Sequence, residues 1–401
     1  MRILVCPHQM GMGGSQLNAI ELAAKVRDLG HEVTIYAPEG TLVAMVKDLG
    51  IGYERAPEDG NNRAWRAGLN RVIEQYRIDL VHAYEWGPSL AASFSAGIRN
   101  STPVVASVMS MKVPEFLPRH VPIIVGTPAL ASVQAWAHRT AFLLEPPVDM
   151  EANRTLDAAA ARQELGIAEH ELVVSIVSML STDLEKLQGI LSAMALVDRL
   201  AAEYPVRLLI AGDGEGKAQV QSRAESINAL HQRTVIDVRG FLQDPRLAYA
   251  AADIVLGMGT SAIKGLAHSK ALIVQGEAGY WQMLSEENAE EFLSNGWFGY
   301  EGRGVADLDD ALVKLLNDAA LRRRMGLFGR ELVESRYNLE RSANELTKIY
   351  FDLLAHRNHS SRSSRARSLL RSAIEVSRFR SSMKSGAPTE REKWSHSGVE
   401  L

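Results

Sequence analysis

Residues 252–276 read ADIVLGMGTSAIKGLAHSKALIVQG and contain a strand, a glycine turn, a helix and a second strand. The apolar run at residues 254–256 predicts a short, buried parallel strand. Residues 257–259 (Gly-Met-Gly) predict a tight turn, and Thr260 or Ser261 can cap the helix that follows. Such a turn lets a backbone approach phosphate closely, and the helix N-terminus favours negative charge. The stretch also fits a plain strand–helix–strand unit with a tight turn.

The same alternation of strands and helices runs through most of the chain. Apolar runs that predict strands recur at residues 3–6, 80–83, 103–108, 122–126, 141–144, 172–177, 206–211 and 235–239, and residues 31–37 alternate as a further strand. Helical patterns lie between these runs, which predicts parallel sheets covered by helices on both faces. The Pro146-Pro147 pair interrupts the alternation. We therefore expect two doubly wound α/β domains, with a cleft at the carboxyl ends of their strands.

The linker and the last helices give the domain boundaries. We expect one doubly wound domain over residues 1–147 and a second over residues 148–335. A long closing helix follows over residues 336–356. Residues 357–401 form a basic tail rich in serine and arginine, and this composition favours disorder.

Composition restricts the class of protein. Of the 401 residues, 46% are hydrophobic and 23% are charged, which is ordinary for a soluble globular chain. The single cysteine, Cys6, excludes a disulfide framework and fits a reducing compartment. The N-terminus lacks the pattern of a signal peptide, and no apolar run approaches the ~18 residues of a membrane span. We therefore expect a cytoplasmic protein that is at most peripheral to the cytoplasmic membrane face.

Charge is divided unevenly along the chain. Of 44 basic and 48 acidic residues, ten basic and four acidic ones lie in residues 356–401, which leaves 34 basic and 44 acidic residues before them. An acidic body argues against nucleic acid as a partner. In the basic tail, apolar positions between Leu369 and Phe379 stand among arginines and fit a short amphipathic segment on an anionic membrane surface. A solubilising tail fits the same composition.

Several short motifs stand in an order that is familiar from one family. They are Gly13-Gly14-Ser15, Gly30-His31-Glu32-Val33-Thr34, Asp79-Leu80-Val81-His82-Ala83, Pro147-Val148-Asp149, Leu209-Ile210-Ala211-Gly212-Asp213-Gly214, Gly240-Phe241-Leu242 and Ala251-Ala252-Asp253-Ile254. With these motifs, residues 1–355 resemble the retaining glycosyltransferases of family 4. The resemblance implies the GT-B fold, in which a Rossmann-like acceptor-side domain and a Rossmann-like donor domain enclose a deep interdomain cleft. It also implies the transfer of a sugar from a nucleotide-sugar donor with retention of configuration.

The resemblance further implies a donor site formed by Gly13, Gly14, Lys186, Gly212, Gly240, Phe241, Leu242, Ser261 and Lys264. The diphosphate leaving group gains charge in the transition state, so the site needs fixed hydrogen-bond donors and cations. Gly13 and Gly14 open a predicted helix and offer backbone N–H groups. Lys186 stands where the family has a phosphate-binding lysine, although it also fits a solvated helix position. The turn at residues 239–242 resembles the turn that binds the nucleotide base.

Several positions depart from the family's pattern. Relatives have a Gly-Arg pair where this chain has Ser178-Met179, and two glutamates where it has Leu256 and Lys264. A glutamate accepts hydrogen bonds from ribose hydroxyls, whereas a lysine only donates, so we expect Lys264 on phosphate instead. Met109 stands where many relatives have histidine, and methionine cannot exchange protons.

Three side chains are candidates for catalysis. His82 and Glu85 end a strand of the first domain, where Glu85 could act as a base, although a satisfied loop cluster fits both residues. Glu277 follows a strand of the second domain and could replace the lost glutamates. No histidine–cysteine cluster has zinc spacing and no Asp-X-Asp pair is evident, so we expect neither a metal nor another cofactor.

Two classes of function fit these residues. The first is an active glycosyltransferase whose acceptor is a glycan, a lipid-linked intermediate or a small molecule. The second is a catalytically inactive GT-B protein that binds a sugar nucleotide or serves as partner to an active transferase, because the two glutamates are missing. An epimerase of the same fold is a third and smaller alternative. The donor sugar, base, linkage and oligomeric state do not follow from the sequence.

Overall fold

The computed structural model of the chain consists of two compact units. It describes residues 1–58, 62–96, 102–110, 112–137, 139–153, 156–242, 244–356 and 362–384. The first unit comprises residues 1–147 and 339–401, and the second comprises residues 148–338. The chain therefore enters the second unit after Pro147 and returns to the first with its last helices.

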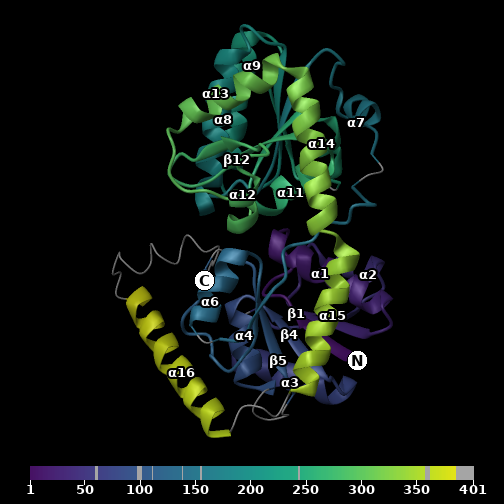
Figure 1. Cartoon of the computed structure of the whole chain (residues 1–401), viewed down its shortest axis with the longest axis vertical. Helices are drawn as coiled ribbons and strands as arrows, with labels where there is room; N and C mark the ends of the chain where they lie inside the picture. The colour runs from purple at the N-terminus through teal and green to yellow at the C-terminus, as the bar shows by residue number, and fades with distance from the viewer. Residues whose placement is uncertain are drawn as a thin grey trace. The chain divides into compact units, whose positions relative to one another are not determined.

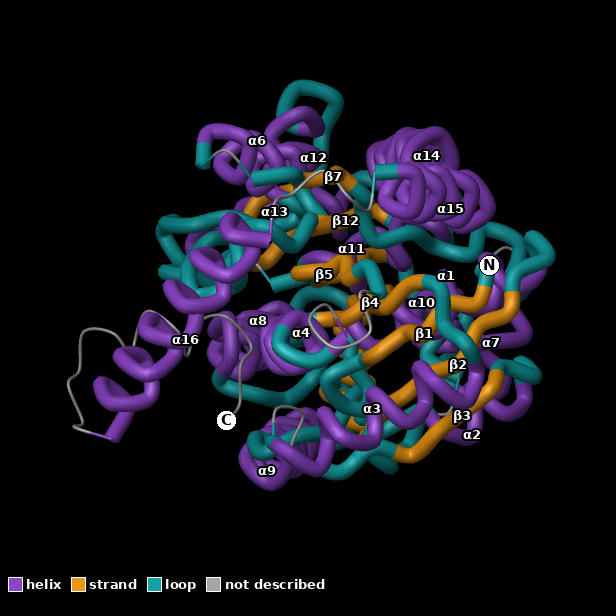
Figure 2. Tube along the Cα trace, turned by 90° about the horizontal axis from the view of Figure 1, so that it is seen from below, coloured by secondary structure: helices purple, strands orange, loops and turns teal. Residues whose placement is uncertain are grey.

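The first unit is built on a parallel sheet of seven strands. Their order is β3-β2-β1-β4-β5-β6-β7, and Figure 2 shows the first five of these strands side by side. The strands are β1 (Arg2–Cys6), β2 (Glu32–Ala37), β3 (Gly52–Arg55), β4 (Leu80–Tyr84), β5 (Val104–Val108), β6 (Ile123–Val125) and β7 (Ala141–Leu143). The central strands are buried on both faces, which explains why their sequences are continuous apolar runs rather than alternating ones.

Helices cover both faces of this sheet (Figure 1). One face carries α1 (Gly14–Asp28), α2 (Val43–Asp48) and α15 (Leu339–Ala355). The other face carries α3 (Arg63–Tyr76), α4 (Trp86–Ser93), α6 (Pro128–Trp136) and α16 (Arg362–Lys384). The long closing helix α15 thus belongs to the core of the first unit, where it packs against α1.

The second unit has a six-stranded sheet in the order β10-β9-β8-β11-β12-β13. The strands are β8 (Leu172–Val177), β9 (Val206–Ala211), β10 (Ile236–Gly240), β11 (Ile254–Gly257), β12 (Ala271–Gln275) and the antiparallel edge strand β13 (Trp281–Met283). One face carries α8 (Lys186–Leu200), α9 (Lys217–His231) and α13 (Val305–Asn317). The other carries α7 (Ala158–Leu165), α10 (Arg246–Ala251), α11 (Gly259–Ala267), α12 (Ala289–Asn295) and α14 (Ala319–Arg336).

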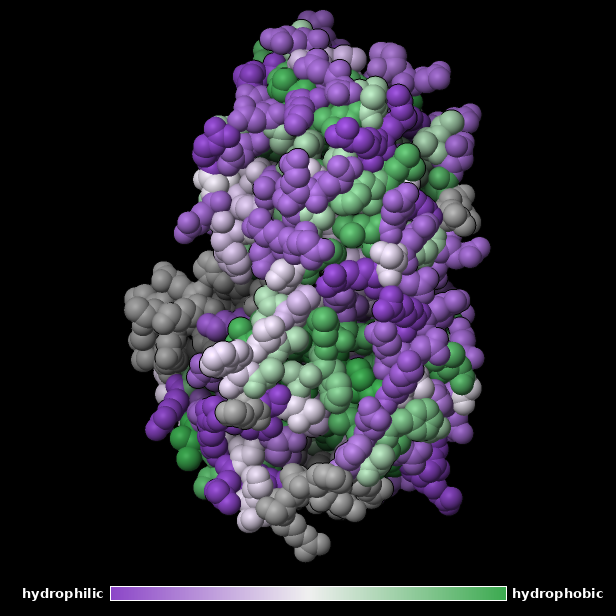
Figure 3. All heavy atoms as spheres, in the orientation of Figure 1, coloured by the Kyte–Doolittle hydropathy of each residue, from purple (hydrophilic) through white to green (hydrophobic). Residues whose placement is uncertain are grey.

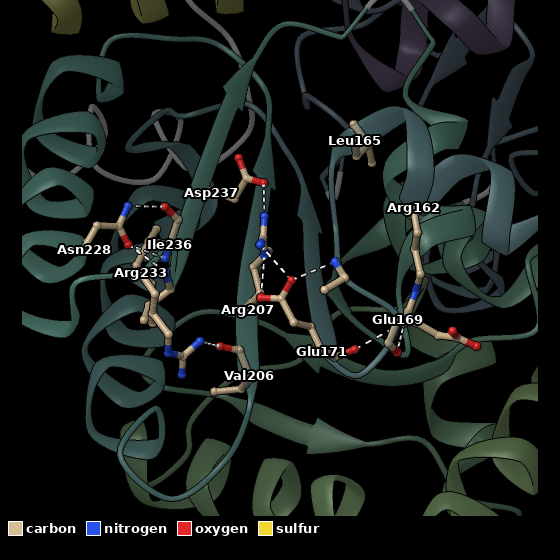
Figure 4. Close-up of polar contacts among 12 residues, drawn as sticks. Arg162, Leu165, Glu169, Glu171, Val206, Arg207, Asn228, Arg233, Ile236 and Asp237 are labelled. Carbon is tan, nitrogen blue, oxygen red and sulfur yellow. Dashed lines mark hydrogen bonds and ion pairs between the residues drawn. The ribbon is translucent and has the colours of Figure 1, made fainter.

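An ion-pair network holds the amino ends of three strands in the second unit (Figure 4). Arg207 in β9 donates to Glu171, just before β8, at 2.7 Å and to Asp237 in β10 at 3.2 Å. All three side chains are nearly buried, so removing one partner would leave a charge without compensation. The network lies at the edge of the sheet opposite to the carboxyl ends of these strands. We therefore assign it a role in the stability of the second unit rather than in ligand binding.

The structure corrects the expected disorder of the tail over residues 362–384, where α16 is helical. The ring of Phe379 is 9% exposed and lies 5.2 Å from the ring of Phe116. The composition of this segment did not predict a helix, because only a few of its side chains contact the first unit and most of the others are serines and arginines. Residues 357–361 and 385–401 of the expected tail lie outside the described residues. Within the described ranges, no helix combines the length and apolar character needed to cross a membrane.

Gly326 provides a test of the packing in the second unit. A Cβ on Gly326 in α14 would lie 2.1 Å from the backbone oxygen of Ser269, so we expect Gly326→Ala to lower the free energy of unfolding by about 1–3 kcal/mol. Gly87 in α4 has open space around its Cβ position, so Gly87→Ala should be neutral or stabilising by at most about 1 kcal/mol. Urea unfolding followed by tryptophan fluorescence measures both changes. Equal midpoints for the two variants would contradict this packing.

Candidate functional site

Each sheet reverses its strand order at one central pair of strands. The pair is β1 and β4 in the first unit, and β8 and β11 in the second. Because the two strands of each pair run parallel, their carboxyl ends meet at the same edge of the sheet. Open parallel sheets bind ligands outside this edge, where the loops that follow the two strands diverge. The predicted site residues of each unit end or follow strands at this edge, except His82, which lies within β4.

In the first unit, the Glu85 side chain joins the loops that follow three neighbouring strands. Glu85 comes directly after β4. Its Oε1 accepts hydrogen bonds from Ser15 Oγ in α1 and from Met109 N after β5, both at 3.0 Å. Its Oε2 accepts a hydrogen bond from Ser110 Oγ at 3.3 Å. The sequence indicated Glu85 but not these partners, because they stand 24 to 70 residues away along the chain.

The backbone of Glu85 is strained. Its φ of 62° and ψ of 179° lie in a region that is nearly restricted to glycine and that costs other residues about 1–3 kcal/mol. Burial raises the pKa of Glu85 above its ordinary value, while the hydrogen bonds from Met109, Ser15 and Ser110 oppose this rise. Strained residues persist only where their surroundings hold them, and they gather at functional sites. Glu85 is therefore the stronger of the two catalytic candidates in the first unit.

His82 lies inside the first unit and is fully buried. Its Nδ1 is 2.6 Å from the hydroxyl of Tyr350 in α15, and its Nε2 is 2.7 Å from Ser107 Oγ in β5. Burial lowers the pKa of His82 to about 3, so the ring stays neutral. Both ring nitrogens thus have hydrogen-bond partners within the core. This geometry favours a structural role for His82, which links α15 to the sheet, rather than the catalytic contact that we expected.

Gly13 and Gly14 stand at the start of α1. Gly13 is the N-cap residue with an extended backbone, and α1 begins at Gly14. No side chain caps this helix end, so the N–H groups of its first turn remain available to an anion. This arrangement agrees with the backbone donors expected here, and Ser15 connects the same turn to Glu85.

In the second unit, Ser261 links the two central strands. Its hydroxyl donates to Val177 O at the end of β8, at 2.8 Å, and accepts a hydrogen bond from the Tyr249 hydroxyl at 3.1 Å. The expected cap by Thr260 or Ser261 is wrong, because α11 begins at Gly259 with Met258 as its N-cap residue and no capping side chain. Ser261 lies inside the first turn, where its hydroxyl binds α11 to the end of β8. The hydroxyl is therefore engaged within the second unit.

Lys264, the lysine that we expected on phosphate, stands in the last turn of α11. It is half-buried and has no hydrogen bond or ion pair from its ammonium group to any described residue. The helix N-terminus itself has less to offer than the sequence suggested. Gly259 N already donates to Trp297 O at 2.9 Å, and Ser261 N donates to Met258 O at 3.1 Å. Negative charge at this edge would therefore depend on Lys264 more than on the helix end.

Lys186 begins α8 after a tightly wound loop. Leu184 and Glu185 both have left-handed backbones, with φ of 52° and 53°, so α8 starts only at Lys186. The Lys186 ammonium group forms an ion pair with Asp183 at 2.9 Å. This pair neutralises Lys186, so a phosphate would have to compete with Asp183 for it.

Glu185 organises the loop that carries Glu277, which no sequence motif indicated. Glu185 O accepts a hydrogen bond from Gln275 Nε2, and Glu185 Oε2 accepts one from Ala278 N, both at 3.0 Å. Gly189 makes room for the Gln275 side chain, since a Cβ there would lie 1.8 Å from Nε2. Glu277 is held between these contacts, with its backbone N donating to Gly299 O at 3.0 Å.

The glycine turns after β9 and β10 touch each other. Gly212 has a φ of 153°, and a Cβ there would lie 1.8 Å from Ser178 O, so only glycine fits. Its N–H donates to Gly240 O at 2.7 Å, which leaves it unavailable to a phosphate. After Gly240, the Phe241 ring is half exposed beside this turn, while Leu242 packs into the core. Phe241 can therefore offer an apolar surface to a base.

Metal ligation has no support among the residues that the structure describes. No group of three or more histidine, cysteine, aspartate or glutamate side chains in those ranges is placed to hold a metal ion.

His82 predicts how the stability of the first unit depends on pH. Its pKa is about 3 in the folded unit against 6.5 for an ordinary histidine, so the unfolded chain binds a proton below pH 6.5 and the folded unit does not. The free energy of unfolding should therefore fall as the pH drops below 6.5, by at most about 1.4 kcal/mol per pH unit for this group. The His82→Gln variant should lose this part of the slope.

The Tyr350→Phe variant is the matched control for His82→Gln. It keeps the buried imidazole and should keep the slope, with stability lower by about 1–3 kcal/mol because Nδ1 loses its partner. Nuclear magnetic resonance of the imidazole in the unsubstituted protein reports the same group directly. Titration of His82 near pH 6.5 in the folded protein would contradict the assignment.

One protein-family model matches part of the chain. Residues 12–123, which lie in the first unit, match the model of Glycosyltransferase Family 4. No curated protein sequence matches the chain.

Solved structures resemble nearly the whole body of the chain. A glycosyltransferase from Rickettsia africae is 16% identical with a TM-score of 0.70, over 88% of this chain and 98% of its own. HepE of Anabaena in complex with UDP-glucose is 17% identical with a TM-score of 0.70, over 88% and 100% of the two chains. Sucrose-phosphate synthase from Thermosynechococcus elongatus is 16% identical with a TM-score of 0.66, over 88% and 99%. The chain therefore has the GT-B fold of two Rossmann-like units, and the family that matches its first unit is Glycosyltransferase Family 4.

Proposed function

We propose that the chain is a retaining glycosyltransferase that moves a sugar from a nucleotide-sugar donor to an acceptor. The observation that carries the proposal is the set of groups at the carboxyl edge of the second unit's sheet. Five parallel strands, β8 to β12, end there in two touching glycine turns, two lysines and an acidic loop. HepE, which shares the fold, was solved with UDP and with UDP-glucose, so UDP-sugars are the first donors to test.

The donor is assigned to the second unit. Lys264 and Lys186 would stabilise the charge that develops on the departing diphosphate, and Lys264 contributes more because Asp183 already neutralises Lys186. The base would lie against the turn at Gly240 with the Phe241 ring beside it. These lysines take the part that a divalent cation has in many phosphate sites, so the proposal includes no metal and no other cofactor.

The acceptor is assigned to the first unit. Glu85 ends β4 with a strained backbone and a pKa raised by burial, which suits a group that exchanges a proton with an acceptor hydroxyl. Glu277 in the second unit is the acid proposed on the donor side. The acceptor class stays open among a glycan, a lipid-linked intermediate and a small molecule. The single buried cysteine is in keeping with a cytoplasmic location.

Calorimetric titration with a panel of UDP-, GDP- and TDP-sugars tests the proposal. We expect one donor to bind with a micromolar dissociation constant, because the Lys264 ammonium group has no partner among the described residues and can bind the diphosphate. Absence of binding across the panel, with the protein folded, would contradict the proposal. Binding without transfer to any acceptor would favour the catalytically inactive alternative. With a donor and acceptor identified, the anomeric configuration of the product tests retention.

Variants of Lys264 distinguish a contact with phosphate from a contact with ribose. Lys264→Gln should weaken donor binding about tenfold or more, because one charge-assisted hydrogen bond is lost. Lys264→Glu should weaken it further if the side chain faces phosphate. Tighter binding by Lys264→Glu would instead show that this position faces the ribose. Lys314→Gln is the matched control, because Lys314 is an exposed lysine in the last turn of α13 of the same unit.

A further inference from the structure

Helix α16 docks on the first unit through one of its faces. The Ser372 hydroxyl donates to Phe116 O, and His120 N donates to Ser368 Oγ at 3.2 Å. The Phe379 ring completes this face and packs between the aromatic rings of Phe116 and Trp86, at 5.2 and 6.5 Å. Serines 368 and 372 and Phe379 recur at intervals of about one or two helical turns, so they share one side of the helix. Docking thus buries Phe379, one of the apolar side chains that an isolated amphipathic tail would offer to a membrane.

The opposite face of α16 combines exposed apolar side chains with arginines. Leu370 and Ile374 are one turn apart, and 64% and 46% of their surfaces are exposed. Arg367 and Arg378 fall on the same side of the helix by their spacing and are also exposed. Along the edge of the molecule where α16 lies, Figure 3 shows hydrophobic spheres among strongly hydrophilic ones. We call these four residues the outer face of α16.

The charge of α16 is opposite to that of the rest of the protein. Residues 362–384 hold seven basic residues and one acidic residue, Glu375, which is paired with Arg371 at 2.7 Å. Residues 1–355 are acidic, with 34 basic and 44 acidic residues. A partner that fits α16 must therefore be anionic, and it must also accept Leu370 and Ile374. An anionic lipid surface meets both requirements, since headgroups attract arginine and the acyl boundary accepts short apolar side chains.

We propose that the outer face of α16 binds the surface of a membrane that contains anionic lipids. The docked face keeps the helix on the first unit while the outer face meets the headgroups, so α16 is a folded attachment element rather than a disordered tail. The exposed apolar pair favours lipid over nucleic acid, which would be contacted by charge alone on this face. The inference does not depend on the transfer of a sugar and stands if the proposed function fails.

Vesicle flotation with the full chain tests this inference. The vesicles are made of phosphatidylcholine alone or of equal parts phosphatidylcholine and phosphatidylglycerol. We expect binding only to the anionic vesicles, and weaker binding as salt is added. The triple variant Arg367→Glu, Arg378→Glu and Arg380→Glu changes the two arginines of the outer face and a further exposed arginine of the same helix. It should reduce partitioning on the order of 100-fold, since each basic residue at a surface contributes about fivefold. The double variant Leu370→Ser and Ile374→Ser should reduce it without any change of net charge.

The control is a triple variant with the same change of net charge in the second unit. Arg223→Glu, Arg323→Glu and Arg324→Glu replace three exposed arginines of α9 and α14. This control should keep its binding to anionic vesicles. Equal loss in both triple variants, or no binding of the unsubstituted protein to anionic vesicles, would overturn the proposal. Tighter binding to a duplex oligonucleotide than to vesicles, lost in the α16 variants, would overturn it in favour of nucleic acid.

Discussion

The structure depends on the parallel pairing of two strands at the centre of each sheet. In the first unit β1 pairs with β4, and in the second β8 pairs with β11. At each pair one polar side chain crosses between the two strand ends. Glu85, after β4, accepts from Ser15 after β1, and Ser261, after β11, donates to Val177 at the end of β8. The chain thus places and fixes its chemical groups where the strand order reverses.

Much of the fold could be predicted from the sequence, because buried parallel strands are continuous apolar runs. The runs at residues 172–177 and 206–211 coincide with β8 and β9. The start of α8 could not be predicted, since it depends on left-handed backbones at Leu184 and Glu185, residue types that rarely adopt them. Helix α16 could not be predicted either, because its composition favours disorder and only its contacts with the first unit oppose this.

The candidate site could be predicted in part, and the limit lies in contacts between residues far apart in the chain. The sequence indicated Glu85 and Lys264. It did not indicate the hydrogen bond from Ser15 to Glu85 or the one from Ala278 to Glu185, because these bonds join residues 70 and 93 positions apart. Burial also distinguishes His82 from Glu85, which were both catalytic candidates in the sequence. His82 lies within β4 and faces the core, whereas Glu85 directly follows β4 and faces the strand-end loops.

The central claim is that a nucleotide sugar binds at the carboxyl edge of the second unit's sheet. Hydrogen exchange measured by mass spectrometry, with and without UDP-glucose, tests it directly, since bound ligand slows exchange where it covers or orders the backbone. We predict added protection in the loops after β8, β10, β11 and β12, including residues 178–186 and 275–280. Protection confined to the amino edge of this sheet, near Arg207, or to the first unit alone would contradict the account.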